Sequence, residues 1–269
     1  MTTLEITSPS NPRVKAAAAL RDRRERQRRG QTVIDGTREL RRALDAGVEV
    51  VEAFVCEPML AGEDARAALT ALRSGNAPVH TVSPAAFEKL AFGDRAEGLV
   101  AVITAPSLDL DRLVLPTDPL VVVLEGVEKP GNLGAVLRTA DGAGVDAVIA
   151  ASPRTDLTNP NAIRASAGTL FTVPIAAAPT EAVLAWLRGR DVRIVATRVE
   201  GSRTYTDADL TGPVALVFGA EDVGLTDDWH GPDIEAVSLP MRGVADSLNV
   251  SVTAAVVLYE AIRQRGGTR

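Results

Sequence analysis

The chain has 269 residues, 46% of them hydrophobic, and a net charge of −6, which allows two domains of ordinary size with buried cores. No apolar run approaches the roughly 18 residues of a membrane span, and the N-terminus lacks a signal-peptide pattern, so we expect a cytoplasmic protein with no membrane partner. Cys56 is the only cysteine, and His80 and His230 are the only histidines, which excludes an intramolecular disulfide and argues against a metal site.

The first 44 residues are basic, whereas the rest of the chain is acidic. They contain eleven Arg or Lys residues and five acidic residues, a net charge of +6, so the other 225 residues carry −12. A basic arm on an acidic body indicates an anionic partner, for which nucleic acid is the commonest case. The alternative is a solvated helix whose charges only keep the chain in solution. We predict RNA contacts from Arg13, Arg23, Arg24, Arg28, Arg29 and Arg38.

Residues 1–105 are expected to form a small α/β domain. The residue pattern predicts helices over 14–29, 37–46, 65–73 and 84–90. Short apolar runs predict strands over 32–34, 50–56, 80–82 and 98–104. Three prolines and scattered Asp residues mark 106–119 as a linker.

Residues 120–269 repeat strands and helices. The predicted strands are 120–125, 146–151, 171–175, 193–197, 214–219 and 236–239. The predicted helices are 132–143, 160–167, 180–188 and a closing helix from Ser247. Continuous runs such as Val121–Leu124 suit strands that are buried on both faces, so we expect an α/β fold with a mainly parallel sheet.

Three segments of the second domain carry candidate chemistry. They are LEGVEKPGNLGAVLRTA at 124–140, LVFGAEDVGL at 216–225 and LPMRGVADSLNVS at 239–251. The last segment alone is a good helix cap, because Ser and Asn side chains satisfy the free N–H groups of a helix N-terminus. Together and in this order, the three segments resemble the motifs of the SpoU/TrmH family of RNA ribose 2′-O-methyltransferases, within the SPOUT class.

The resemblance implies a fold, a cofactor and an assembly. It implies an N-terminal RNA substrate-binding domain, a deep trefoil knot near the C-terminus, S-adenosyl-L-methionine as methyl donor, and a homodimer. The positions that match the family's cofactor contacts are Gly219, Leu239 and Leu248. We expect the same pocket to be lined by Thr197, Phe218, Pro240 and Met241. A glycine at 219 would let the ligand approach the main chain closely.

The resemblance also implies an acceptor side, formed by Asn132, Arg138, Glu221, Ser247 and Asn249. The family's usual proposal makes Arg138 the base that takes the ribose proton. A guanidinium keeps its proton up to a pH of about 12, so we expect instead a charged side chain that holds a phosphate and stabilises the developing alkoxide. Glu221 would orient it. Arg138 lies about 120° around a helix from Asn132, so it would act from the helix flank or across a subunit boundary.

A further segment and the domain architecture bear on the RNA substrate. Residues 164–168 (RASAG) also resemble a family segment, in which Arg164 would pair with an RNA phosphate or a dimer partner. The domain architecture favours large-subunit (23S) ribosomal RNA over transfer RNA. We assign His80, His230, Trp186 and Trp229 to packing or to the surface.

Two alternatives belong to other function classes. A non-catalytic RNA-binding or ribosome-assembly protein could use the same scaffold, but it would have no reason to keep all five acceptor-side residues. The GNLG at 131–134 after a strand suggests a nicotinamide-dependent oxidoreductase. The full Gly-x-Gly-x-x-Gly pattern is absent, however, and Ala150 and Ala151 stand where an acidic residue is needed.

Overall fold

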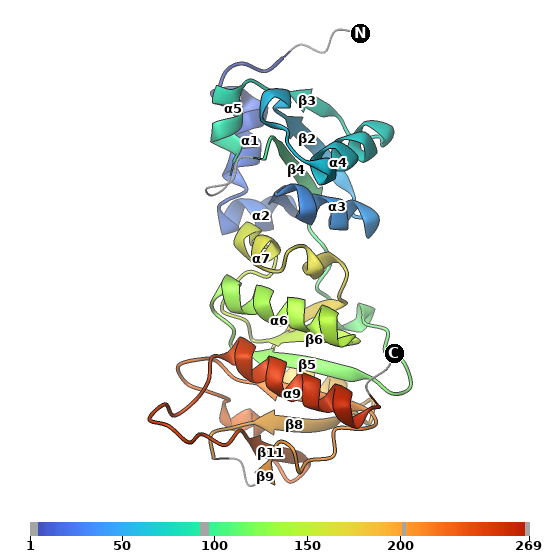
Figure 1. The fold of residues 1–269 in the computed structure, drawn as a ribbon, viewed down its shortest axis with the longest axis vertical. Helices are drawn as coiled ribbons and strands as arrows, with labels where there is room; N and C mark the ends of the chain where they lie inside the picture. Colours follow the sequence, from blue (N-terminus) through green and yellow to red (C-terminus); the bar gives the residue numbers. More distant parts are fainter. Residues whose placement is uncertain (1–4, 92–96, 201–202, 267–269) are drawn as a thin grey trace. The chain divides into compact units, whose positions relative to one another are not determined.

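The computed structural model of the chain (Figure 1) describes residues 5–91, 97–200 and 203–266. Its contacts divide the chain into two compact units, Met1–Pro106 with Asp156–Thr172, and Ser107–Thr155 with Val173–Arg269. This division differs from the predicted one in two respects. Residues 156–172, which we expected in the second domain, belong to the first unit, and 107–119 belongs to the second unit instead of forming a separate linker.

The first unit contains a four-stranded sheet in the order β1-β4-β2-β3. Its strands are β1 (Gln31–Asp35), β2 (Val50–Val55), β3 (Val79–Thr81) and β4 (Leu99–Thr104). β4 runs antiparallel to β1 and β2, and β3 runs parallel to β2. The helices are α1 (Pro12–Ala19), α2 (Arg23–Arg29), α3 (Thr37–Asp45), α4 (Glu63–Ser74), α5 (Pro84–Leu90), α7 (Pro160–Ala165) and the 3-10 helices η1 (Glu57–Met59) and η3 (Thr169–Phe171).

The helix predicted over 14–29 is broken into α1 and α2. Asp22 causes the break, because its side chain accepts hydrogen bonds from the backbone N–H groups of Arg24 and Glu25. An Asp that caps a new helix N-terminus competes with continuation of the preceding helix. The prediction of one continuous basic helix was therefore wrong.

Long-range polar contacts attach residues 156–172 to the first unit. Arg26 is 3% exposed, and its Nη2 pairs with Asp156 Oδ2 at 2.6 Å. Arg164 Nη2 donates to Asp35 Oδ2 at 2.9 Å. Each pair joins positions about 130 residues apart in the sequence, so only the folded chain brings them together.

The second unit contains a seven-stranded sheet in the order β7-β6-β5-β10-β8-β11-β9. Its strands are β5 (Leu120–Glu125), β6 (Ala147–Ala151), β7 (Ile175–Ala178), β8 (Arg193–Thr197), β9 (Arg203–Thr204), β10 (Val214–Phe218) and β11 (Ile234–Ser238). All of these strand pairs are parallel, which confirms the predicted sheet. The trefoil knot that the resemblance implies stays a prediction.

Helices cover both faces of this sheet. They are α6 (Pro130–Ala143), α8 (Thr180–Arg188), α9 (Val250–Gln264) and the 3-10 helices η2 (Leu110–Arg112) and η4 (Asp227–Trp229). α6 and α9 pack side by side (Figure 1). No helix in the described ranges is both long and apolar enough to cross a membrane.

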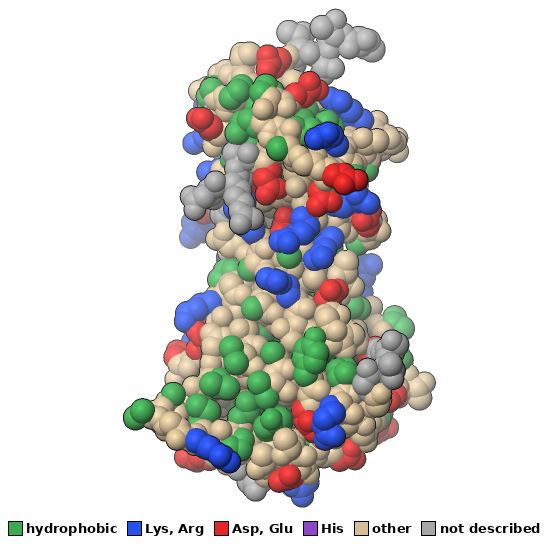
Figure 2. Space-filling view, in the orientation of Figure 1, with side chains coloured by type: hydrophobic (Ala, Val, Ile, Leu, Met, Phe, Trp, Pro, Cys, Tyr) green, Lys and Arg blue, Asp and Glu red, His purple; other side chains and the backbone are tan. Residues whose placement is uncertain are grey.

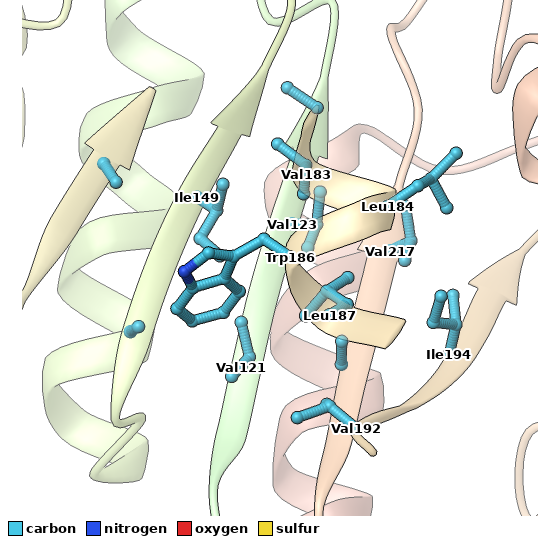
Figure 3. Packing of buried hydrophobic residues seen from close by; sticks show 14 of the residues in the cluster. Val121, Val123, Ile149, Val183, Leu184, Trp186, Leu187, Val192, Ile194 and Val217 are labelled. Atoms are coloured by element: carbon cyan, nitrogen blue, oxygen red, sulfur yellow. The ribbon is translucent and has the colours of Figure 1, made fainter. Parts of the chain in front are cut away.

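The core of the second unit follows from the alternation of side chains along its strands. Val121 and Val123 of β5 pack with Ile149 of β6 and Trp186 of α8 on one face (Figure 3). Because side chains alternate between the faces, Val122 of the same strand points to the other face and is also fully buried. The continuous apolar runs are therefore explained by burial on both faces.

The strand predicted over 171–175 is displaced to β7. Pro174 lies at the boundary, and because proline lacks an N–H it is suited to the position before a strand. Its carbonyl still accepts a hydrogen bond from Val148 N at 2.9 Å, which aligns β7 with β6. Residues 169–171 form η3 instead.

Candidate active site

Three segments of the second unit bring polar side chains together. Asn132 lies in the first turn of α6, Glu221 follows β10, and Asn249 precedes α9. Asn249 Nδ2 donates to Glu221 Oε1 at 2.7 Å and to Asn132 Oδ1 at 3.3 Å, and Asn132 Nδ2 also donates to Glu221. Residues up to 117 positions apart in the sequence thus form one hydrogen-bonded cluster.

Lys129 completes this cluster and was missed by the sequence analysis. Its ammonium group forms an ion pair with the Glu221 carboxylate. The hydrogen bond from this pair raises the pKa of Lys129 above its usual value. Lys129 stands next to Pro130 in the first motif, but nothing in the sequence distinguishes it from an ordinary surface lysine.

Asn249 acts in two ways. Its side-chain Oδ1 accepts hydrogen bonds from Ser251 N at 2.9 Å and Ser251 Oγ at 2.6 Å, so it caps α9. Its Nδ2 faces Glu221 and Asn132. The cap that the sequence suggests and the role that the motif implies therefore use opposite ends of one amide group.

Arg138 does not join the cluster within one chain. It lies on an exposed face of α6 and forms no hydrogen bond or ion pair with any residue in the described ranges. The expected contact between Glu221 and Arg138 is not made in the described part of the chain, and the Glu221 carboxylate instead accepts hydrogen bonds from Lys129, Asn132 and Asn249. The six-residue offset from Asn132 turns Arg138 toward another side of the helix, as helical geometry requires.

A cavity of about 500 Å³ adjoins the cluster. Of the residues predicted to bind the donor, its walls include Thr197, Phe218, Gly219, Leu239, Met241 and Leu248. Pro240 is not among the lining residues. Glu221 and Ser247 of the acceptor side also reach this cavity, whereas Asn132 lines a smaller adjoining cavity of about 80 Å³.

Gly219 is needed for a reason within the chain, beside the approach of a ligand, which stays a prediction. A Cβ at this position would lie 2.3 Å from the Gly224 carbonyl carbon and 2.5 Å from Leu225 N. The loop after β10 folds back on itself here, with mutual backbone hydrogen bonds between Ala220 and Gly224 at 3.1 and 3.0 Å. The close approach is therefore between two parts of the chain itself.

The cavity also contains residues that the sequence analysis did not select. Arg198 follows Thr197 at the carboxyl end of β8, where ligands of parallel sheets usually bind, and this position was the available signal. Burial lowers the pKa of Arg198, while the charges of Asp227 and Glu125 oppose that shift. His230, which we assigned to packing or to the surface, is exposed and lines the cavity as well.

Comparison with known proteins identifies the family. Residues 119–259 match the SpoU rRNA Methylase family, and residues 11–101 match the MRM3-like substrate binding domain. The chain belongs to the SpoU rRNA methylase family.

One sequence relative and two solved structures, each matched over most of its own length, illustrate the likeness. A 23S rRNA (uridine(2479)-2′-O)-methyltransferase of Streptomyces viridochromogenes is 32% identical over 92% of this chain and 88% of its own length. The crystal structure of an RNA 2′-O ribose methyltransferase has a TM-score of 0.84 at 40% identity, and covers 97% of this chain and 99% of its own. The crystal structure of the SpoU methyltransferase AviRb of Streptomyces viridochromogenes in complex with AdoMet has a TM-score of 0.87 at 31% identity. The match covers 96% of this chain and 100% of the AviRb chain.

Within the first unit of this SpoU methylase, most of the predicted RNA contacts already have partners. Ion pairs join Arg13 to Glu52 at 3.3 Å, Arg28 to Glu25 at 2.7 Å, Arg29 to Glu25 at 3.2 Å, Arg38 to Glu39 at 3.3 Å and Arg164 to Asp35 at 2.9 Å. The hydrogen bond with Arg28 is the main cause that lowers the pKa of Glu25. An RNA phosphate would have to compete with these carboxylates.

Arg23 and Arg24 differ from the other predicted contacts. Both are exposed in the first turn of α2, and neither guanidinium has a carboxylate partner among residues 5–91, 97–200 and 203–266. The structure therefore leaves these two cations of the basic arm available to a ligand.

Proposed function

We propose that this protein transfers a methyl group from S-adenosyl-L-methionine to a ribose 2′-hydroxyl of large-subunit ribosomal RNA. The observation that carries the proposal is the cluster of Asn132, Glu221 and Asn249 beside the cavity at Gly219. Such a substrate would place the enzyme in the cytoplasm. The names of the relatives support both the reaction and the RNA.

The residues of the cavity fit the proposed donor. A volume of about 500 Å³ lies within the range of small-molecule sites. Leu239, Met241 and Leu248 offer apolar surface for an adenosyl group, and Ser247 and Glu221 supply polar groups at the cluster end. S-adenosyl-L-methionine supplies an electrophilic methyl group when it is bound.

The acceptor-side residues would then position the ribose. Glu221 holds the Asn132 and Asn249 amides in one orientation, so their geometry is set before RNA binds. Ser247 lines the cavity and can hydrogen-bond the ribose hydroxyl. Arg138 would remain charged, hold the neighbouring phosphate and stabilise negative charge as it develops on the 2′-oxygen.

A homodimer would explain the exposed surface that contains Arg138. Val252 and Tyr259 of α9 are 47% and 55% exposed, and hydrophobic side chains gather over α6 and α9 in Figure 2. Gly142 of α6 lies against the Tyr259 hydroxyl, so the two helices present one continuous face. An exposed apolar face of this kind marks an interaction site, and Arg138 projects from the same side of α6 as Gly142.

Replacing Tyr259 with aspartate is expected to convert the dimer to a monomer. The new carboxylate would lose hydration without gaining a partner in an apolar interface. Light scattering after size-exclusion chromatography measures the change in mass. Val114→Asp is the matched control, because Val114 is 87% exposed elsewhere in the same unit and its substitution should leave the mass unchanged. A monomeric wild-type protein would contradict the homodimer.

Tritium transfer tests the proposed reaction. Purified protein is incubated with labelled donor and ribosomal RNA that lacks the modification, and the labelled nucleoside is then identified. We expect label on a ribose of 23S RNA. Asn249→Asp is a suitable inactive control, because aspartate still caps α9 but places a second carboxylate against Glu221. Label in transfer RNA, or no label at all, would refute the proposed substrate or the proposed activity.

Replacing both Arg23 and Arg24 with alanine is expected to weaken RNA binding and to reduce the slope of log affinity against log salt by about 2, or about 1 for each phosphate contact. The paired Arg28 and Arg29 supply the control, because their double alanine variant removes two cations that share the Glu25 carboxylate as a partner. Binding is measured by filter retention of ribosomal RNA across a salt series. Equal losses in the two double variants would show that the basic arm acts only through its total charge.

A further inference from the structure

Glu125 is a buried carboxylate that the proposed reaction does not use. It ends β5 and is 4% exposed, and a carboxylate in such surroundings requires hydrogen-bond donors. Its Oε2 accepts from Thr226 N at 2.8 Å, and its Oε1 accepts from Thr226 Oγ1 at 2.8 Å and from Thr180 Oγ1 at 3.1 Å. Both oxygens are therefore satisfied within the protein.

Thr226 connects Glu125 to the loop that forms one wall of the cavity. Residues 219–225 line the cavity, and Thr226 follows them without lining it. β10 holds the start of this loop, and the Ala220–Gly224 backbone pair holds its middle. Thr226 is itself exposed, and its bonds to Glu125 hold the end of the loop together with Leu225, which packs against the hydrophobic core.

The same loop contributes to both parts of the site. Gly219 and Leu225 lie in the cavity wall, and Glu221 holds Asn132 and Asn249 on the acceptor side. A shift at the end of the loop would therefore change the shape of the cavity and the position of the Glu221 carboxylate together.

We propose that Glu125 is a positioning residue that acts through Thr226 to hold residues 219–226 in the shape that binds the methyl donor. This inference rests on the proposed function. It assigns a role to an acidic residue at the start of the first motif, which lines the smaller cavity beside Asn132, and to a threonine just past the second motif, which lines neither cavity.

The experiment compares three variants of the full-length protein. Thr226→Val removes the hydroxyl that bonds Glu125 and keeps the side-chain shape. Thr226→Ser keeps the hydroxyl. Thr180→Val removes a hydroxyl from the same carboxylate on the side of α8, where no cavity residue depends on it. S-adenosyl-L-methionine binding is measured by calorimetry, and loop mobility is measured by hydrogen exchange of the peptide that contains residues 219–226.

Thr226→Val is expected to bind the donor about tenfold more weakly, as loss of a hydrogen bond to a charged group implies, and to exchange faster in the loop. Its KM for the donor should rise more than its kcat falls. Thr226→Ser should restore both properties, and Thr180→Val should lower the melting temperature without either effect.

Two results would overturn the role of Glu125. One is wild-type donor affinity and loop exchange in Thr226→Val, and the other is an equal loss of affinity in Thr180→Val, which would indicate general destabilisation. A wild-type protein that binds no donor would instead refute the proposed function, and the hydrogen-exchange comparison would still decide whether Glu125 and Thr226 hold the loop.

Discussion

Replacing Arg138 with alanine is expected to lower kcat/KM for ribose methylation by about 10²- to 10³-fold, the usual effect of losing a group that stabilises transition-state charge. Donor affinity should stay at the wild-type value, because Arg138 does not line the cavity. The fold should also be unaffected, since the exposed guanidinium has no partner in the described part of the chain. Single-turnover methyl transfer and donor calorimetry measure the two quantities.

Two further variants sharpen this test. Arg138→Lys keeps the charge but loses the planar donor fork, so an intermediate rate would indicate that both charge and geometry contribute. Arg188→Ala is the control, because it removes an exposed arginine of α8 that is paired with Asp233 at 2.7 Å, away from the cluster. Wild-type turnover in Arg138→Ala would contradict the proposed role. Loss of donor binding would indicate that Arg138 acts on the donor side instead of the acceptor side.

Replacing Asp156 with alanine is expected to lower the free energy of unfolding by about 3–5 kcal/mol, because it leaves a buried cation without a counter-charge. Arg26 is 3% exposed, and its Nε and Nη2 donate to Asp156 Oδ2 at 2.8 and 2.6 Å. Its Nη1 bonds only carbonyl oxygens, those of Leu20 and Arg21, which carry no full charge. Urea denaturation followed by circular dichroism measures the loss.

Arg26→Met tests the cause of this loss. Methionine removes the buried cation, and Asp156 keeps hydrogen bonds from Thr158 N and Oγ1 at 2.9 and 2.8 Å, so the expected destabilisation is much smaller. Arg28→Ala, which removes an exposed and solvent-screened ion pair, should leave the stability almost unchanged. If Asp156→Ala were as stable as the Arg28 variant, the buried ion pair would not hold this segment in place.

The sequence predicts the second unit well where burial controls the residue pattern. Val121–Leu124 suits a strand that is covered on both faces, and it forms the interior strand β5. The predictions failed where a single side chain overrode the pattern. Asp22 caps a new helix, α2, and Pro174 lies just before β7, which begins at Ile175 instead of residue 171. Membership of residues 156–172 in the first unit depends on contacts such as Arg26 with Asp156, which no local pattern encodes.

The family resemblance identified more residues of the candidate site than physical reasoning from the sequence did. The resemblance identified Asn132, Glu221 and Asn249, which the structure brings together. It did not identify Lys129 as the counter-charge of Glu221, because that pairing depends on how two loops meet. It also assigned Glu221 to Arg138, a contact that one chain does not make.

The course of the chain through α7 limits how the two halves of the protein can be exchanged between enzymes. A fragment that stops at residue 106 would lack Asp156 and Arg164, the partners of Arg26 and Asp35. Grafting the first unit onto another methylase would therefore require transplanting residues 156–172 together with the N-terminal stretch. A simple N-terminal fusion would deliver an incomplete module.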